Sequence, residues 1–535
     1  MRPSLPKTSL ARRSGVNAIK GISRFLCVAL VCTGCQRTPH ADLEADAATL
    51  RIAFEAKPSR VDPRYASDAY SARVVGLVFV SLVTPGADGG FRPYLARSWR
   101  WDDARTCTFD LTEGFGFEDG RPVRADDVVA TFQAVLAADS GSPRRSTLSK
   151  VLAVEAVGGT SVRFHLSEPD AAFFEGATLG VLASEQAALD NPAAGELLAS
   201  GPYRVGSVEP DGSVGLVRNP HFLHAPVPIP RIHIRVIPDA LTRVLELENG
   251  SVDLVQSAID PDTVDWLARR DEDIEVTRTA SANFQYLGIN LRHAVLADVR
   301  VRRALAHAID RDAITREIFN GQARTADSML PPEHWAHTKH VHSWRYDPQH
   351  ARALLDRAGL RDPDGDGPQP RVSLDFKTTT EDLSRRIAEV LAAQLAAVGI
   401  ELRIRSYDWG TFFADIQRGE FHLYSLQWVG IADPDILRQV LHSELRPPLG
   451  SNRGGFVDRR TDRLTELARG AMDPDMRRRL YARVERRAAR LLPYVPLWWP
   501  ERVIVSNRRL TGFQAHPAGD LLGLLDARLE PLGTR

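Results

Sequence analysis

Residues 371–429 have the sequence RVSLDFKTTTEDLSRRIAEVLAAQLAAVGIELRIRSYDWGTFFADIQRGEFHLYSLQWV, whose pattern indicates the class of fold. Its first six residues predict a strand, and apolar residues then recur at helical spacing over 381–398 until Gly399 ends the helix. An alternating run at 400–405, a short helix and a third strand follow. Strands separated by helices predict an open α/β sheet with helices on its faces. Ligands of such sheets bind outside the carboxyl ends of the strands, where Trp428 falls.

Length and composition are those of a globular protein. The 535 residues suffice for two or three domains, and 43% of them are apolar and 25% charged. Because 68 basic residues balance 68 acidic ones, neither a general nucleic-acid partner nor a general anionic-membrane partner is expected, although local basic patches remain open. Cys107 is the one cysteine beyond the N-terminal region and lies in the strand-like segment RTCTFDL, so we expect a packed thiol and no internal disulfide.

Two further local patterns predict helices. Apolar residues recur at helical spacing over 69–83. The segment ADDVVATFQAVLAA places Val128, Phe132 and Val135 on one face, and Asp126 is its expected N-cap. Both segments are therefore expected to form helices.

The N-terminal region has the pattern of an export signal. Its first 24 residues carry six basic side chains and no acid, and the apolar run FLCVALVC (25–32) is too short to span a bilayer. Two small residues and Cys35 follow, which resembles a bacterial lipobox, although Cys32 stands where leucine is usual. We expect a signal peptide over 1–34, a tether over 35–49, and a protein of the periplasm or cell envelope that lipid at Cys35 anchors to the membrane. Secretion with cleavage nearby is the alternative.

Ordered motifs run through the body of the chain. SGPYRV occupies 200–205, YLGINLRHAVLADVRVRRALAHAIDRDAI occupies 286–314, and LLPYVPLWW occupies 491–499. An upstream motif is formed by Leu95, Ala96, Ser98, Trp99, Phe109, Leu111, Gly114, Phe117, Gly120, Ala125, Asp127 and Val128. In this order the motifs resemble the family-5 peptide- and nickel-binding solute receptors of bacteria.

The resemblance implies an α/β fold of the periplasmic-binding-protein type II class, a flytrap whose two lobes close on a ligand, with an extra domain on one lobe. It also implies a monomer that captures oligopeptides or peptide-like solutes and presents them to ABC transporter permease subunits. The expected divisions are 50–92, 200–285 and 501–535 for lobe I, 93–199 for the extra domain, and 286–500 for lobe II.

Motifs of common catalytic sites are absent from the mature sequence. It has no G-x-S-x-G elbow, H-E-x-x-H helix, P-loop or C-x-x-C, so we expect no catalytic residue and no cofactor. Imidazoles suit nickel, copper or zinc, and five gather in one segment: His334, His337, His340, His342 and His350. Pro331 and Pro332 precede them, so we expect a solvated loop without metal. A nickel or chelated-metal receptor, and a ligand-sensing receptor not coupled to import, are the alternatives.

Peptide recognition needs few side chains, because an extended peptide can pair its backbone with a strand edge. Our candidate ligand-binding residues are Glu55, Ala56, Tyr407, Trp409, Trp428, Asp433, Asn452 and Arg453. In the resembled family, peptide-binding members often place an aspartate three residues after the tryptophan that corresponds to Trp428. Ile431 stands there in this chain, so we expect Asp433 to hold the ligand's ammonium group. A purely structural role in the turn before Pro434 is the alternative.

Overall fold

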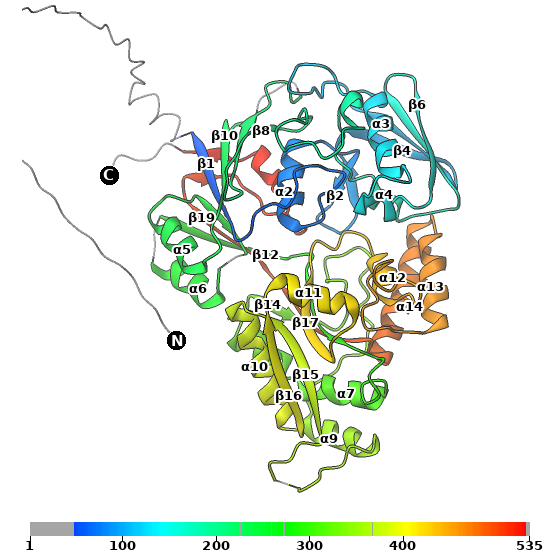
Figure 1. The fold of residues 1–535 in the computed structure, drawn as a ribbon, viewed down its shortest axis with the longest axis vertical. Helices are drawn as coiled ribbons and strands as arrows, with labels where there is room; N and C mark the ends of the chain where they lie inside the picture. Colours follow the sequence, from blue (N-terminus) through cyan, green and yellow to red (C-terminus); the bar gives the residue numbers. More distant parts are fainter. Residues whose placement is uncertain (1–47, 224–226, 258, 271–272, 366, 531–535) are drawn as a thin grey trace, which may run out of the picture. The chain divides into compact units, whose positions relative to one another are not determined.

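The computed structural model describes residues 48–223, 227–257, 259–270, 273–365 and 367–530 (Figure 1). These residues belong to one compact unit of the chain. The expected signal peptide and Cys35 lie outside the described residues, as does most of the expected tether. Within the described ranges, every helix falls short of the length and apolarity that crossing a membrane requires.

Lobe I is built on a seven-stranded mixed sheet in the order β12-β19-β11-β1-β10-β9-β8. Its strands are β1 (Thr49–Phe54), β8 (Tyr203–Val208), β9 (Val214–Arg218), β10 (Arg231–Val236), β11 (Leu254–Gln256), β12 (Ile274–Thr279) and β19 (Arg502–Asn507). The central strand β1 pairs in parallel with β10 and β11 and is mostly buried, as a strand covered on both faces should be. The helices of this lobe are α2 (Ala69–Val78), α5 (Ala240–Glu248) and α6 (Pro261–Arg270).

The extra domain is an antiparallel four-stranded sheet in the order β4-β5-β7-β6. It consists of β4 (Ala96–Asp103), β5 (Thr106–Leu111), β6 (Val151–Val157), β7 (Ser161–Leu166), α3 (Ala125–Leu136) and α4 (Phe173–Gly176). Cys107 lies wholly buried on β5, which confirms the expected packed thiol. The expectation for Asp126 as N-cap was wrong, because α3 begins at Ala125, two residues earlier than that N-cap implies. Its N-cap is Arg124, whose backbone N–H donates to the Asp127 carboxylate at 2.9 Å.

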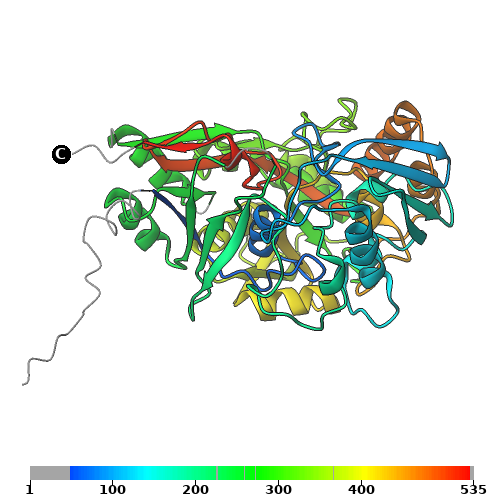
Figure 2. The same cartoon turned by 90° about the horizontal axis from the view of Figure 1, so that it is seen from above.

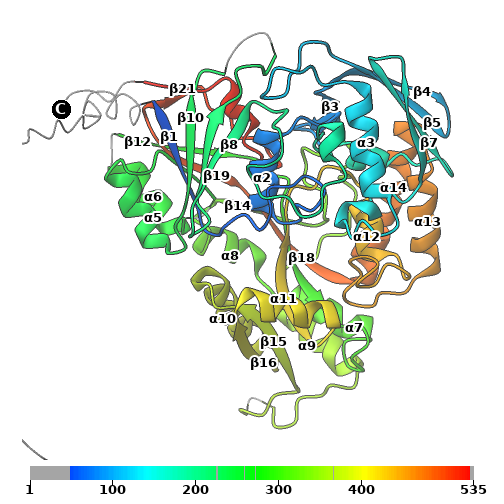
Figure 3. The same ribbon diagram turned by 45° about the horizontal axis from the view of Figure 1, so that its top comes forward.

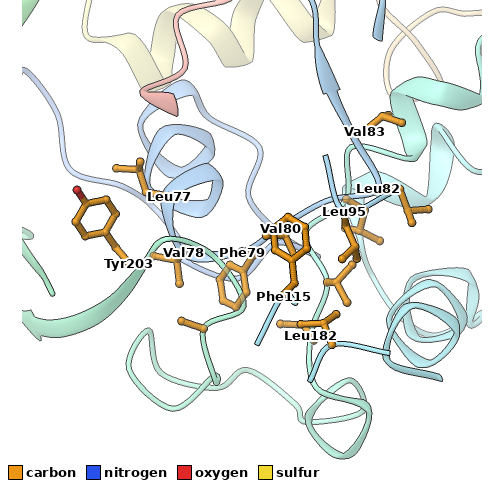
Figure 4. Close-up of a cluster of buried hydrophobic side chains, with 14 of the residues drawn as sticks. Leu77, Val78, Phe79, Val80, Leu82, Val83, Leu95, Phe115, Leu182 and Tyr203 are labelled. Atoms are coloured by element: carbon orange, nitrogen blue, oxygen red, sulfur yellow. The ribbon is translucent and has the colours of Figure 1, made fainter. Parts of the chain in front are cut away.

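A continuous apolar core joins lobe I to the extra domain. The residues after α2 enter it as extended chain, and Phe79, Val80 and Leu82 pack among side chains from both sheets (Figure 4). Full burial of one such side chain contributes roughly 1.5–3 kcal/mol relative to exposure. The helix predicted over 69–83 therefore stops at Val78, because the next residues are held in this core.

Lobe II is built on a six-stranded sheet in the order β14-β18-β13-β17-β15-β16. Its strands are β13 (Phe284–Ile289), β14 (Ala323–Thr325), β15 (Val372–Thr379), β16 (Ile400–Tyr407), β17 (Leu423–Trp428) and β18 (Tyr494–Pro500). Its helices are α7 (Val299–Ala308), α8 (Arg311–Glu317), α9 (Pro348–Arg357), α10 (Asp382–Ala396), α11 (Trp409–Arg418), α12 (Ile436–Leu441), α13 (Arg459–Arg469) and α14 (Pro474–Leu491). Strands β15 and β16 run parallel over their full length, and Gly399 beyond α10 has φ +84°, so the fold predicted for 371–429 is confirmed.

The chain passes between the two large sheets at residues 280–283, which join β12 to β13, and at Glu501, which joins β18 to β19. In Figure 2 the red C-terminal strands run alongside green strands of lobe I, and β12 pairs with β19 in register. The two connections touch, because the Ser281 hydroxyl donates to the Pro500 carbonyl. Two adjacent crossing segments between lobes have the form of a hinge.

Candidate ligand-binding site

The lobe II side of the candidate site centres on Trp428, the last residue of β17. The Trp428 indole stacks on the Tyr286 ring with centroids 6.2 Å apart and planes at 9°. The Arg453 guanidinium carbon lies 4.7 Å from the Trp428 ring centroid and 5.2 Å from that of Phe413. Arg453 also donates to the Tyr286 hydroxyl at 3.0 Å. We call these four residues, Tyr286, Phe413, Trp428 and Arg453, the aromatic–arginine platform.

The platform holds two unused hydrogen-bond donors. Trp428 Nε1 and Arg453 Nε are buried, and neither has an acceptor among the described residues. Leaving a buried donor unpaired costs about 1–3 kcal/mol. A ligand carbonyl or carboxylate that reached either atom would supply the acceptor it lacks. Arg453 also lines a cavity within lobe II, together with Asn452, Tyr424 and Tyr494.

The lobe I side begins where β1 ends. Glu55 follows β1, and its carboxylate accepts a hydrogen bond from the Tyr70 hydroxyl of α2. The Arg73 guanidinium carbon lies 5.5 Å from the Tyr70 ring centroid and 5.6 Å from that of Phe54. Ala56 is exposed beside Glu55. The carboxyl end of β1 therefore presents the Glu55 carboxylate beside the Tyr70 hydroxyl and the Arg73 guanidinium, which lie one turn apart on α2.

Arg386 of α10 in lobe II pairs with Asp260 and Asp262 of lobe I at 3.4 and 3.3 Å, so α10 lies close to lobe I. Glu381, at the start of α10 in lobe II, has its pKa raised first by desolvation and then by the Glu55 carboxylate of lobe I. The positive charge of Arg243 on α5 lowers the pKa of the same Glu381 carboxyl group. Helix α11 lies on the side of the six-stranded sheet that faces α2 (Figure 1, Figure 3). Its first residue, Trp409, is 58% exposed and stacks on Phe413.

The other sequence-predicted residues have partners within lobe II. Tyr407, at the end of β16, lies 5.1 Å from the Lys377 ammonium. Asn452 is 2% exposed, and its amide bonds the backbone of His442 and Phe456 at 2.7–3.0 Å. The Asn452 side chain therefore stabilises the loop in which it lies.

Asp433 already has a guanidinium partner. Its two carboxylate oxygens accept hydrogen bonds from Arg477 of α14 at 2.9 and 2.6 Å, and one of them also accepts the Asp435 backbone N–H at 2.7 Å. Asp433 is 5% exposed. A ligand ammonium would have to replace or share Arg477 there, so the anchoring role of Asp433 stays a prediction.

An ion-pair network that sequence reasoning missed joins the extra domain to lobe II. Asp170 of the extra domain accepts two hydrogen bonds from Arg469 of α13, at 2.9 and 2.7 Å. Arg469 lies 3.4 Å from the Asp435 carboxylate, which also accepts the Tyr481 hydroxyl at 2.8 Å. Beside this network, desolvation by the surrounding protein and then the Asp433 carboxylate raise the pKa of Glu175 to about 7, although the Glu175 side chain itself is exposed to solvent.

The Glu175 carboxyl makes stability depend on pH. A pKa raised from 4.5 means that the folded protein keeps the proton longer than the unfolded chain, so stability falls as pH rises from about 4.5 to 7. The Glu175→Gln variant should therefore melt at the same temperature as wild type at pH 4 and at a slightly higher temperature at pH 8, the gain being small because the side chain is exposed. Thermal unfolding across pH measures this. Equal melting temperatures at pH 8 would contradict the assignment.

Residues 90–443 match the family described as bacterial extracellular solute-binding proteins, family 5 Middle. The chain belongs to this family. This family-5 protein is 27% identical over 512 residues to the probable di/tripeptide-binding protein 5 of Pseudomonas aeruginosa, with 89% of this chain and 94% of that one covered. It is 23% identical over 488 residues to the oligopeptide-binding protein AppA of Bacillus subtilis, with 88% and 89% covered.

Solved structures share the fold of this family-5 protein. NikZ from Campylobacter jejuni in complex with Ni(L-His) superposes with a TM-score of 0.80 at 24% identity, covering 90% of this chain and 99% of that one. AppA from Bacillus subtilis in complex with a nonapeptide superposes with a TM-score of 0.78 at 23% identity, covering 90% and 99%. The predicted two-lobed type II architecture is therefore confirmed.

The histidines of the histidine-rich segment of the family-5 protein have different neighbours. His334 is 5% exposed against Gly89, and His337 bonds the Leu330 carbonyl at 2.8 Å. His342 packs on Trp344, and His350 packs on His307 of α7. Among the described residues, no three histidine, cysteine, aspartate or glutamate side chains are grouped so that they could hold a metal ion.

Proposed function

We propose that this family-5 solute-binding protein captures a peptide or peptide-like solute between its lobes outside the cytoplasm and presents it to the permease of an ABC transporter. The observation that carries the proposal is the aromatic–arginine platform at the carboxyl end of β17, with its two unpaired donors. Peptide carbonyls are acceptors of the kind these donors lack, and aromatic faces accommodate varied side chains. Relatives named as di/tripeptide- and oligopeptide-binding proteins support the same ligand class.

The mechanism is reversible binding with lobe closure. The hinge at 280–283 and Glu501 lets lobe II rotate toward lobe I, so that Trp428 and Arg453 approach the Glu55 and Arg73 side of the site. Closure would exclude water and strengthen each polar contact with the ligand. No covalent step is involved, and we assign no catalytic residue.

X-ray scattering tests the closure. Purified protein stripped of ligand by partial unfolding and refolding should have a larger radius of gyration than the same protein saturated with a mixture of short peptides. A radius that stays unchanged, while calorimetry shows that the peptides bind, would contradict closure. Absence of any peptide binding would contradict the proposed ligand class instead.

We also propose that Cys35 carries the lipid that keeps the protein at the membrane. The basic N-terminal segment, the short apolar run and the cysteine that follows support this. Metabolic labelling with palmitate should mark the wild-type protein, and the Cys35→Ala variant should be unlabelled and appear in the soluble extracytoplasmic fraction. An unlabelled wild-type protein would exclude the anchor.

A further inference from the structure

Helix α14 carries a line of arginines on its outer side that the proposed function does not use. Arg479, Arg483, Arg486 and Arg490 are separated by four, three and four residues, so they share one face of the helix. Three of them are exposed and Arg486 is half-buried. At 1.5 Å per residue the line is about 16 Å long. We call these four residues the basic stripe.

The charges of the basic stripe are not neutralised within the protein. None of its four side chains has a carboxylate within 4.0 Å among the described residues, although the neighbouring Arg477, Arg478 and Arg487 all have one. The only acid in the sequence from 479 to 490 is Glu485, which is 2% exposed and points inward. Burial raises the pKa of Glu485 to about 8, so it does not offset the stripe at neutral pH.

Further positive charge flanks the carboxyl-terminal end of the stripe. Arg303 of α7 donates to the Arg490 carbonyl at 3.2 Å, which places its guanidinium beside this end of α14. The exposed Arg345 lies in the segment whose Trp344 indole donates to the Ala489 carbonyl at 2.9 Å. The local excess contrasts with the net charge of zero over the whole chain.

We propose that the basic stripe is a docking surface for the anionic phospholipid headgroups of a bilayer. Four long cationic side chains in a straight line fit a flat, negatively charged plane, and each basic residue near such a surface adds to the attraction. The family acts outside the cytoplasm, and the expected export signal would place this chain beside a membrane. Residues 36–535 hold 62 basic and 68 acidic side chains, since six of the 68 basic residues lie in 1–24, so attraction would act through this face alone and would also fix the protein's orientation on the bilayer.

Vesicle co-sedimentation tests the proposal. Residues 36–535 are used, so that neither an acyl chain nor the basic and apolar N-terminal segment contributes to binding. It should bind vesicles of phosphatidylcholine with one-third phosphatidylglycerol at least tenfold more tightly than vesicles of phosphatidylcholine alone, and high salt should abolish the difference. Equal binding to the two vesicles, or binding to soluble polyglutamate but not to vesicles, would overturn the proposal.

Matched variants locate the surface. Joint replacement Arg479→Gln, Arg483→Gln, Arg486→Gln and Arg490→Gln should weaken binding to the anionic vesicles at least tenfold. A control with the same change in charge replaces exposed arginines that have no carboxylate within 4.0 Å among the described residues: Arg97→Gln, Arg105→Gln, Arg145→Gln and Arg231→Gln. The control, and a variant with lysine at all four stripe positions, should bind like the parent. An equal loss of vesicle binding in the control variant would overturn the proposal. A loss of vesicle binding in the lysine variant would also overturn it, and this test remains available if the glutamine variant of the stripe fails to fold.

Discussion

Replacing Arg477 with methionine is expected to lower the free energy of unfolding by about 3–5 kcal/mol. Arg477 is 6% exposed and gives two hydrogen bonds to Asp433, which is 5% exposed. Without the guanidinium, the Asp433 carboxylate stays buried with no opposite charge paired to it, and an unpaired buried charge is far costlier than a missing surface contact. Urea unfolding of wild type and variant at pH 7 measures the difference.

The next residue supplies a matched control. Arg478 is exposed and pairs with the exposed Asp475, so Arg478→Met should cost no more than about 1 kcal/mol. Adding Asp433→Asn to Arg477→Met removes both charges and should recover part of the loss. Equal effects of Arg477→Met and Arg478→Met would show that the buried pair is unimportant.

The same variant tests the predicted ligand role of Asp433. If a peptide ammonium can take the place of the guanidinium, added peptide should stabilise Arg477→Met more than it stabilises wild type, because it restores a charge partner. Asp433→Asn should then weaken peptide binding about 10- to 100-fold. Neutral outcomes in both tests would leave Asp433 with its structural role alone.

Dismantling the aromatic–arginine platform should have the largest effect on binding. Trp428→Ala removes the face on which Arg453 rests and one of the two unpaired donors, so peptide affinity should fall at least 100-fold, about 2.7 kcal/mol. Arg453→Met keeps most of the side-chain volume but removes the other donor and the cation–π contacts, and should cost at least tenfold. Calorimetric titration with a mixture of short peptides measures both.

An aromatic residue outside the site controls for nonspecific damage. Tyr346 is 45% exposed and belongs to neither side of the candidate site, so Tyr346→Ala should bind peptide like wild type. Thermal unfolding of each variant shows whether it is folded at the titration temperature. Unchanged affinity in a folded Trp428→Ala protein would remove the platform from the ligand site.

Local periodicity was sufficient to predict the core of lobe II. The strands β15 and β16 and the helix α10 between them form from residues close in sequence, and Gly399 ends the helix through its own backbone conformation. The segment after α2 differs. Its apolar residues fit a helix as well as an extended core strand, and the choice is made by distant partners. Val80 is held extended by Val181 and Ser200, more than 100 residues further along the chain.

Site residues could be predicted from the sequence only where they lie at the end of a predicted strand. Trp428 could be placed from the pattern of β17, and Arg453 joins it across a loop of lobe II. The partner of Asp433 could not be predicted, because Asp433 lies in the loop before α12 and Arg477 is 44 positions away on α14. The pair of Asp170 and Arg469 spans 299 positions and two domains, and no local pattern marks either residue.

Native mass spectrometry of the protein purified from its own host identifies the solute that it carries. We expect a ligand-bound population whose excess mass corresponds to short peptides or peptide-like solutes. That excess should disappear in Trp428→Ala and persist in Tyr346→Ala. An excess mass that matches a metal ion or metal chelate, or a peptide excess that Trp428→Ala retains in full, would contradict capture of peptide-like solutes at this platform.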